Sequence, residues 1–317
     1  MSHLGRDGSA GAIPGAGGTP ELAVSTLRFE PPLDIPGSLA GLGRWGDDLI
    51  DRWDGHRWLR TLWIGERAVP VRARSTGDAS APSLEVQASL EHLVAAAGHV
   101  AGFFVQAPAA LAELEARDPA IAGAEARFPG IRPVLQPDPV TALVRAISAQ
   151  QVNLRWAAEI RRRLAVRYGH THELGGEEVR TLDVDALAGA SVDDLRALQL
   201  TRAKSAAVIG VAQAALDGSL GQEVLERLDD EAVIERLVAL RGIGRWSAEW
   251  FLARTLGRPR VVAGDLGVRK AVGRAYFGGR MPAEAEVRSA TAHWGGAAGV
   301  AQQLLLHQLV EDGPARG

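Results

Sequence analysis

The sequence predicts a mainly α-helical protein in which a smaller α+β domain precedes a bundle of short helices. Short segments rich in β-branched and aromatic residues are concentrated in the first third of the chain. After residue 107, apolar residues recur at helical spacing almost to the end of the chain. With 317 residues, of which 46% are hydrophobic, the chain is long enough to bury a substantial core.

The N-terminal part is expected to consist of a tail and an α+β domain. Residues 1–22 begin with a stretch rich in Gly, Ala and Ser and lack the pattern of a secretory signal, so we expect a disordered tail on a cytoplasmic protein. Residues 23–106 contain short alternating segments separated by Pro and Gly, which indicates an α+β domain. The expected strands are Val24–Phe29, Arg57–Ile64, Ala68–Ala73 and Leu84–Ser89, and the expected helix is Leu90–Gly98.

Residues 107–317 are expected to form a compact helical region in which strand signals are nearly absent. The expected helices are Ala109–Arg117, Pro139–Ser148, Asn153–Tyr168, Val192–Leu198, Ala203–Leu216, Glu231–Leu240, Ser247–Leu256, Leu266–Phe277, Ala283–Ala290 and Ala297–Val310. His170 and His172 are assigned to a polar loop rather than to a metal site. No run of eighteen apolar residues is present, so no membrane partner is expected.

Composition excludes several kinds of site. The chain has no cysteine, which rules out disulfides, thiolate zinc sites and iron–sulfur clusters. The net charge of −3 argues mildly against nucleic-acid binding. The charge is unevenly distributed, however: residues 141–170 carry a net +5, residues 171–240 a net −8, and residues 241–280 a net +7. This pattern fits either a polarised surface for phosphates or ordinary solvated helix faces.

The segment Leu240–Ala248 joins two expected helices through a Gly-Ile-Gly turn. Gly242 can end the first helix in the left-handed conformation, and Gly244 removes side-chain bulk where the chain reverses. The unpaired N–H groups of the next helix then face the turn, and Arg245 adds a positive charge beside them. The turn can therefore grip one phosphate, although a plain tight turn between helices would have the same pattern.

Asp265 ends the apolar stretch 260–265, twenty-one residues after Gly244, and precedes the helix expected from Leu266. Asp is a favoured helix N-cap, so capping alone would explain it. The helix dipole also favours an ionised carboxylate at this position. Breaking an N-glycosidic bond creates positive charge on the deoxyribose, which one carboxylate can stabilise while it orients or deprotonates a water.

The hairpin followed by Asp265 resembles the helix-hairpin-helix superfamily of DNA glycosylases, and the nearest likeness is the 3-methyladenine DNA glycosylase II group. Three further segments resemble that group: Phe29–Asp34, Ala146–Asn153 and Leu198–Lys204. The resemblance spans roughly Leu27–Glu311. It implies an N-terminal antiparallel α+β domain followed by a two-subdomain helical bundle, with the active cleft between the subdomains. The helix-hairpin-helix would occupy residues 233–256, and the loop that carries the acid residues 260–266.

The resemblance also implies roles for individual residues. Asp265 would be the catalytic residue of a glycosylase that flips alkylated purines out of duplex DNA to begin base excision repair. Trp246 and Trp250, four residues apart, would line the base pocket, where an aromatic face suits a cationic base; the alternative is that both are core tryptophans. The residues expected to bind DNA are Gly242, Gly244, Arg245, Ser247 and Gln151.

The sequence departs from the pattern of the group at three positions. Gln151 stands where the group tends to have a bulky apolar wedge, which puts the wedge mechanics in doubt. Leu309 stands in the place of a pocket tryptophan, and Gly264 precedes the acid where the group can carry a second Asp.

The strand-nicking members of the superfamily carry a Schiff-base lysine at the position of Trp246 in this chain. The only lysines here are Lys204 and Lys270, neither at that position, so a monofunctional enzyme is expected. We also expect it to be a monomer. No iron–sulfur cluster or zinc is expected, and the resemblance allows a monovalent cation at the hairpin. Two alternatives remain open: a non-catalytic module that binds damaged DNA, and a bifunctional enzyme that acts through one of the two lysines.

Overall fold

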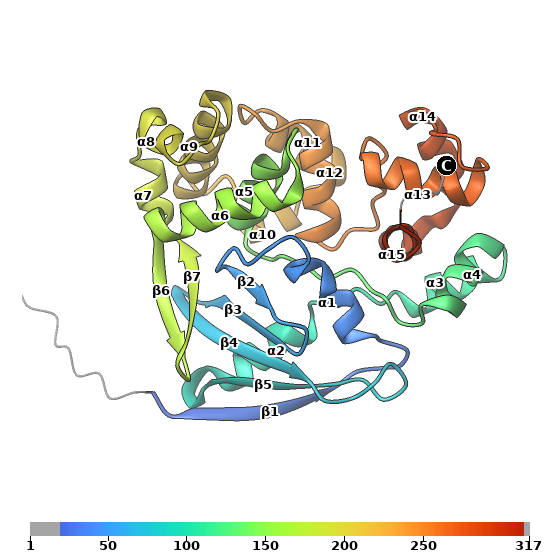
Figure 1. Ribbon diagram of the computed structural model, residues 1–317, viewed down its shortest axis with the longest axis horizontal. Helices are drawn as coiled ribbons and strands as arrows, with labels where there is room; N and C mark the ends of the chain where they lie inside the picture. The colour runs from blue at the N-terminus through green and yellow to red at the C-terminus, as the bar shows by residue number, and fades with distance from the viewer. Residues whose placement is uncertain (1–19, 314–317) are drawn as a thin grey trace, which may run out of the picture.

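The N-terminal domain is a five-stranded antiparallel sheet with the strand order β1-β5-β4-β3-β2 (Figure 1). The computed structural model describes residues 20–313, so most of the expected tail lies outside the described residues. The strands are β1 (Leu22–Arg28), β2 (Asp51–Trp53), β3 (Arg57–Ile64), β4 (Arg67–Ser75) and β5 (Ser83–Ser89). Strand β1 already begins at the last residue of the expected tail, because Leu22 pairs with Ser89 of β5.

Helix α2 (Leu93–Ala101) covers the apolar face of this sheet and packs on β1, β3 and β5. Alternate residues of β5 point into this layer, where Leu84, Val86 and Ala88 are fully buried. A 3-10 turn occupies Leu90–His92, so the expected helix begins three residues later than the sequence indicated. Helix α1 (Ile35–Gly43) starts after its N-cap Asp34 and packs near β2.

One helical subdomain combines residues from both ends of the helical region. It contains α3 (Pro108–Glu115), α4 (Pro119–Arg127), α13 (Leu266–Tyr276), α14 (Glu284–Thr291) and α15 (Ala298–Glu311). These helices share a core in which Trp294 and Leu304 are buried, with α15 packed against both α13 and α4. The last residues of the described chain thus pack beside the first helices of the region (Figure 1).

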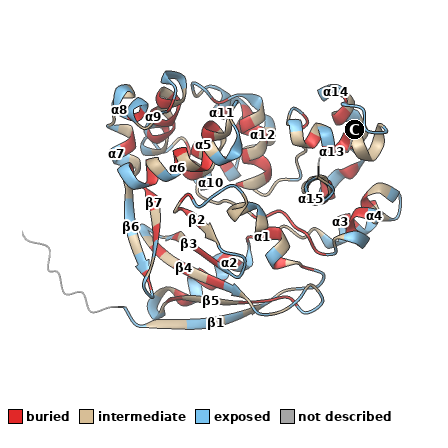
Figure 2. Ribbon diagram, viewed as in Figure 1, coloured by how far each residue is buried: buried red, intermediate tan, exposed pale blue. Residues whose placement is uncertain are grey.

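The other helical subdomain contains the remaining helices and has its own core. Its helices are α5 (Pro139–Ala149), α6 (Leu154–Tyr168), α7 (Val184–Ala188), α8 (Val192–Ala197), α9 (Arg202–Leu216), α10 (Gln222–Glu226), α11 (Asp230–Val238) and α12 (Arg245–Arg254). Side-chain caps begin several of them, for example Asp138, Asn153 and Thr201. Figure 2 shows buried residues along the inner sides of these helices. The expected architecture, an antiparallel α+β domain followed by two helical subdomains, is confirmed.

A β-hairpin interrupts the helical region and was not expected. Strands β6 (Gly169–Leu174) and β7 (Glu177–Leu182) pair antiparallel and extend down beside β3 and β4 (Figure 1). His170 and His172 therefore lie in a strand, and their assignment to a loop was wrong. The hairpin escaped prediction because its outward positions are polar and only Leu174 and Val179 reach a small core with Leu59. Within residues 20–313, no helix is long and apolar enough to cross a membrane.

Candidate active site

The hairpin between α11 and α12 follows the expected geometry at its first glycine. Gly242 has φ +85°, and a Cβ there would lie 2.6 Å from the Cβ of Ala207. Gly244 is the N-cap of α12 with φ −101°, and a Cβ there would meet no atom within 4 Å. The fold thus requires glycine at position 242 but leaves open space beside position 244.

The first turn of α12 presents main-chain donors at this open space. Gly244 has no side chain with which to cap the helix, and the first intrahelical hydrogen bond runs from Ala248 N to Gly244 O. The N–H groups of residues 245–247 therefore lack helical partners and can bind an anion. The Ser247 side chain itself is buried, so it would approach a phosphate through its N–H rather than its hydroxyl.

The guanidinium of Arg245 is paired with acidic side chains of the protein itself. Its Nε donates to Glu249 Oε1 at 3.1 Å and its Nη2 donates to Glu231 Oε1 at 3.1 Å. Glu249 is buried and also accepts from Arg260 Nη2 at 3.2 Å and Arg288 Nη2 at 2.8 Å. Through an i,i+4 pair on its own helix, Arg245 is therefore tied to an ionic cluster around the buried carboxylate of Glu249.

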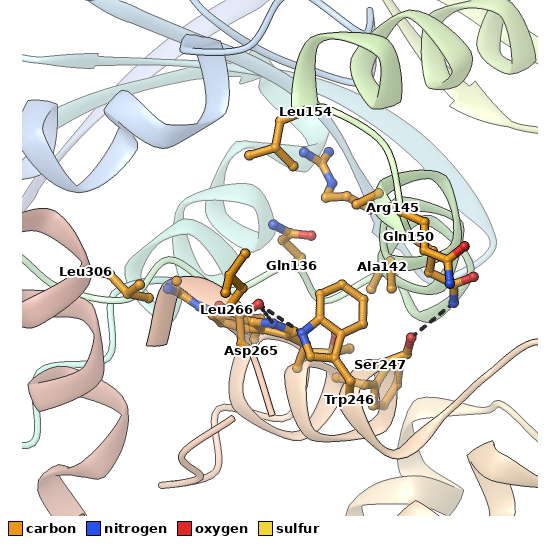
Figure 3. A pocket seen from close by; sticks show the side chains of 18 residues that line it. Gln136, Ala142, Arg145, Gln150, Leu154, Trp246, Ser247, Asp265, Leu266 and Leu306 are labelled. Carbon is orange, nitrogen blue, oxygen red and sulfur yellow. Dashed lines mark hydrogen bonds between the residues drawn. The ribbon is translucent and has the colours of Figure 1, made fainter. Parts of the chain in front are cut away.

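Asp265 lies at the N-terminus of α13 and faces the hairpin helix. Its Oδ1 accepts from Val268 N at 3.0 Å, as the capping role requires. Its Oδ2 accepts from Trp246 Nε1 at 2.8 Å and from Trp250 Nε1 at 3.3 Å (Figure 3). Hydrogen bonds of this kind are strongest when the acceptor is charged. Asp265 is thus a helix cap whose other oxygen is held by both tryptophans.

A cavity of 820 Å³ opens beside this carboxylate, between the two helical subdomains. Its walls are largely apolar and aromatic, which suits a planar heterocycle. Besides Asp265, Trp246 and Trp250, the cavity is lined by Gln136, Leu154, Phe251, Arg254, Leu266 and Leu306, among others. Both tryptophans are half-buried and line the cavity with parts of their rings, so they are not simply core residues.

Gln151 also lines the cavity, from the loop of residues 150–153 between α5 and α6, here called the probing loop. Its backbone has φ +53°, a left-handed value that is uncommon for a residue other than glycine. The preceding residue, Gln150, donates from Nε2 to Gly242 O at 2.9 Å. The same nitrogen lies 3.5 Å from Ser247 Oγ (Figure 3). Gln150 therefore joins the probing loop to the hairpin, a role that sequence reasoning missed.

The structure gives the surroundings of Leu309 and Gly264, two positions at which the sequence departs from the pattern of the group. Leu309 lines a separate cavity of 80 Å³ near Arg274 and does not reach the main cavity, where α15 contributes Leu306 instead. A Cβ added at Gly264 would lie 3.2 Å from Glu284 Oε2, so an acid of α14 already occupies the adjacent space.

Neither lysine lines the cavity. Lys204 donates from Nζ to the main-chain carbonyls of Ser148 and Gln150, and Lys270 is exposed on α13. Trp246 fills the hairpin position at which a Schiff-base lysine would be needed. Within residues 20–313, no cluster of three or more His, Asp or Glu side chains could hold a metal ion.

The comparisons with known proteins agree with this geometry. Residues 144–295, which include both the probing loop and Asp265, match the HhH-GPD superfamily of base excision DNA repair proteins. The chain is 29% identical over 238 residues to DNA-3-methyladenine glycosylase 2 of Escherichia coli, a match covering 72% of this chain and 79% of that protein. It is 26% identical over 184 residues to a DNA-3-methyladenine glycosylase of Bacillus subtilis, but this match spans only 61% of the relative and 57% of this chain.

The fold has a close counterpart among solved structures. The 3-methyladenine DNA glycosylase from Archaeoglobus fulgidus superposes with a TM-score of 0.77 over 91% of this chain and 98% of that one. At 23% sequence identity, this likeness concerns the fold.

Proposed function

The chain belongs to the HhH-GPD superfamily of base excision DNA repair proteins, and from this premise we propose that it is a monofunctional DNA glycosylase that hydrolyses the N-glycosidic bond of alkylated purines in duplex DNA. The observation that carries the proposal is the Asp265 carboxylate, which lies on the wall of a cavity large enough to hold a base and is held there by two indole N–H groups.

The reaction would begin when the hairpin grips the DNA backbone and the damaged nucleotide rotates out of the duplex into the cavity. The free N–H groups at the start of α12 supply donors for one phosphate, a contact that carries no base specificity. Gln151 lies on the cavity wall at an exposed position and would occupy the gap left in the stack. The aromatic walls would enclose the base and exclude bulk water from it.

The chemical step would rest on Asp265. As the bond between the base and C1′ lengthens, the deoxyribose gains positive charge, which the carboxylate stabilises in a partly enclosed site. The same carboxylate can orient or deprotonate the attacking water. An N3- or N7-alkylated purine is already cationic and therefore leaves without protonation by a second acid, so a single carboxylate suffices.

Substituting Asp265 tests the proposal directly. We expect wild-type protein to release 3-methyladenine or 7-methylguanine from alkylated duplex DNA, and Asp265→Asn to release them at least about a hundredfold more slowly. Equal release by both proteins would remove Asp265 from the mechanism. Binding to abasic-site DNA without release of any alkylated base would instead indicate a non-catalytic damage-binding module. The cavity beside Asp265 argues against that alternative, because a module that only grips DNA needs no cavity with a carboxylate on its wall.

Three further features belong to the same proposal. We propose a monomer, because one chain supplies the hairpin, the probing loop and the acid around one cavity. The cytoplasmic location expected from the sequence stays part of the same proposal. A monovalent cation at the hairpin would be held by turn carbonyls. Leu240 O and Gly242 O each accept one hydrogen bond, from Ile243 N and Gln150 Nε2 respectively, so each keeps a lone pair for such an ion.

A further inference from the structure

The side-chain amine of Lys204 lies at the C-terminal end of α5, where the probing loop begins. Its Nζ donates to Gln150 O at 2.7 Å and to Ser148 O at 3.0 Å. Among the residues that the structure describes, Lys204 forms no ion pair with a carboxylate. Partial burial lowers the pKa of Lys204. The ammonium is thus partly withdrawn from water and binds two main-chain carbonyls and no anionic group of the described residues.

One of these carbonyls, that of Ser148, belongs to the last turn of α5, and the other belongs to the extended C-cap residue Gln150. The last C=O groups of an α-helix have no intrahelical donor and carry the negative end of the helix dipole. A lysine ammonium is therefore a favourable cap at this position, and its charge strengthens both hydrogen bonds. Lys204 reaches this position from α9, more than fifty residues further along the chain. The contact therefore fixes α9 against the C-terminal end of α5.

The residue that follows the bound carbonyl is strained. Gln151 has φ +53°, a conformation that persists only where the surrounding structure enforces it. Because Lys204 holds the carbonyl of Gln150, it restricts the orientation of the peptide plane that leads into Gln151. The side chain of Gln150 is fixed as well, through its hydrogen bond to Gly242 O of the hairpin.

Helix α9 therefore supports both loops that would meet DNA. Lys204 binds the start of the probing loop, and one turn later Ala207 lies against Gly242, where it would be 2.6 Å from an added Cβ. Gln150 bridges the two loops. The hairpin and the probing loop thus share one rigid neighbour, and their relative position is set before any nucleic acid is present.

We propose that Lys204 is a positioning residue for base flipping: its ammonium holds the probing loop in the conformation that places Gln151 at the cavity. This inference rests on the glycosylase function proposed above. It gives Lys204 no part in bond cleavage, because its Nζ faces main-chain carbonyls and does not line the cavity. The structure also explains why this lysine is poorly placed to form a Schiff base.

The first experiment uses the free protein and needs no substrate. Hydrogen exchange is measured for residues 148–152 in wild type, Lys204→Met, Lys204→Arg and the control Arg227→Met, which removes an exposed arginine paired only with Glu223. We expect exchange in this segment to rise about tenfold or more in Lys204→Met, with the core helices unchanged. Lys204→Arg, which keeps a charged donor, should restore most of the protection. Unchanged exchange in Lys204→Met would overturn the proposal.

The second experiment measures DNA binding and base release. We expect Lys204→Met to bind undamaged duplex within about twofold of Arg227→Met, because the hairpin contacts remain. Its affinity for duplex containing a tetrahydrofuran abasic analogue should fall about tenfold, and its single-turnover release of 7-methylguanine should fall similarly, while KM changes little. Release and abasic-site affinity equal to wild type would contradict the role assigned to Lys204.

The two proposals can fail separately. If wild-type protein released no base, the glycosylase function would fail, while hydrogen exchange and abasic-site affinity would still decide whether Lys204 positions the loop. If Lys204→Met unfolded below the assay temperature, Lys204→Gln would replace it with the same readouts, since its amide removes the charge but keeps a donor. Borohydride trapping of a covalent DNA adduct that disappears in Lys204→Met would also overturn the proposal, because it would make Lys204 the nucleophile.

Discussion

Trp246 Nε1 donates a 2.8 Å hydrogen bond to Asp265 Oδ2, and through it the hairpin helix holds the carboxylate at the N-terminus of α13. Trp250, one turn further along α12, donates to the same oxygen at 3.3 Å. The residues expected from the sequence to form the base pocket and the residue expected to carry the chemistry are therefore one hydrogen-bonded unit. A change in either tryptophan should affect the carboxylate as well as the cavity wall.

Replacing the tryptophans by phenylalanine should separate these two roles. Trp246→Phe keeps an aromatic ring but removes the shorter N–H donor, so we expect the single-turnover rate of base release to fall about tenfold, typical for a hydrogen bond to a charged group. Trp250→Phe should cost less, about threefold, because its hydrogen bond is longer. The rates are measured with saturating enzyme on alkylated duplex. A larger loss in Trp250→Phe than in Trp246→Phe would contradict the view that the shorter hydrogen bond does more to position the acid.

The two hairpin glycines should respond differently to alanine. Gly242→Ala combines a left-handed backbone with a close contact to Ala207, so it should lower the free energy of unfolding by about 2 kcal/mol. Gly244→Ala meets no neighbour, so its stability should stay within about 0.5 kcal/mol of wild type. Urea denaturation checks both values, and equal destabilisation would contradict the geometry of the turn.

Gly244 should affect DNA binding rather than the stability of the fold. A side chain at this position projects into the open space in front of the free N–H groups of α12, so Gly244→Asp should weaken binding to all duplex sequences alike. Losing one phosphate contact should also reduce the slope of log affinity against log salt by about one. The measurement is a salt titration of duplex binding by fluorescence anisotropy. Wild-type affinity and slope in Gly244→Asp would remove the hairpin from the DNA interface.

A buried ionic cluster joins the N-terminal domain to the helical region and should make stability depend on pH. Asp48 accepts from Arg161 Nε at 2.7 Å and lies 3.4 Å from Arg145 Nη2. Burial alone would raise the pKa of Asp48, but the two arginines and further hydrogen bonds outweigh it and hold the pKa below its ordinary value of 3.8. Because the folded-state pKa is depressed, this contribution to stability is present above that ordinary value and is lost as the pH falls through the folded-state pKa.

Asp48→Asn should therefore lower the free energy of unfolding by about 3–5 kcal/mol near neutral pH, since it leaves the buried guanidinium of Arg161 without a full counter-charge. Arg145 keeps Asp51 as its remaining partner, at 3.1 Å. The difference from wild type should shrink as the pH drops below 3.8. The exposed neighbour Asp47, which pairs with Arg52 at the surface, is the control, and Asp47→Asn should cost less than about 1 kcal/mol. Urea denaturation across this pH range provides the test, and a constant difference between wild type and Asp48→Asn would contradict it.

The sequence was most informative where structure depends on local chemistry. Strand β3 has the bounds expected from its alternation, and α5 begins at the expected proline after its cap Asp138. The hairpin turn and Asp265 were found because a positive φ and an N-cap each favour few residue types. Helix α4 was missed although Asp118-Pro119 is a typical cap followed by a first-turn proline, and the pair Gly175-Gly176 could have indicated the β6–β7 hairpin.

Contacts between distant segments could not be predicted in the same way. The hydrogen bonds from Lys204 to the carbonyls at the end of α5 and the pairing of Arg288 with Glu249 depend on how helices pack, and no spacing in the sequence encodes them. Leu309 illustrates the same limit. It matches a pocket position by resemblance, yet α15 turns it toward a small separate cavity and presents Leu306 to the main one.

Leu306 and Leu309 therefore form a matched pair for testing which face of α15 meets the base. Both leucines are partly buried and packed against the same core, so their replacement by alanine should cost similar stability. Leu306 lies 3.3 Å from a Cβ added at Gly267, two residues after Asp265, and so reaches the cavity near the acid. We expect Leu306→Ala to lower kcat/KM for alkylated duplex about tenfold, the effect of removing one apolar contact with a bound base, and Leu309→Ala to leave it within about twofold of wild type. If Leu309→Ala lost more activity than Leu306→Ala at equal stability, the base would have to bind on the α13 side of α15, outside the cavity that Asp265 lines.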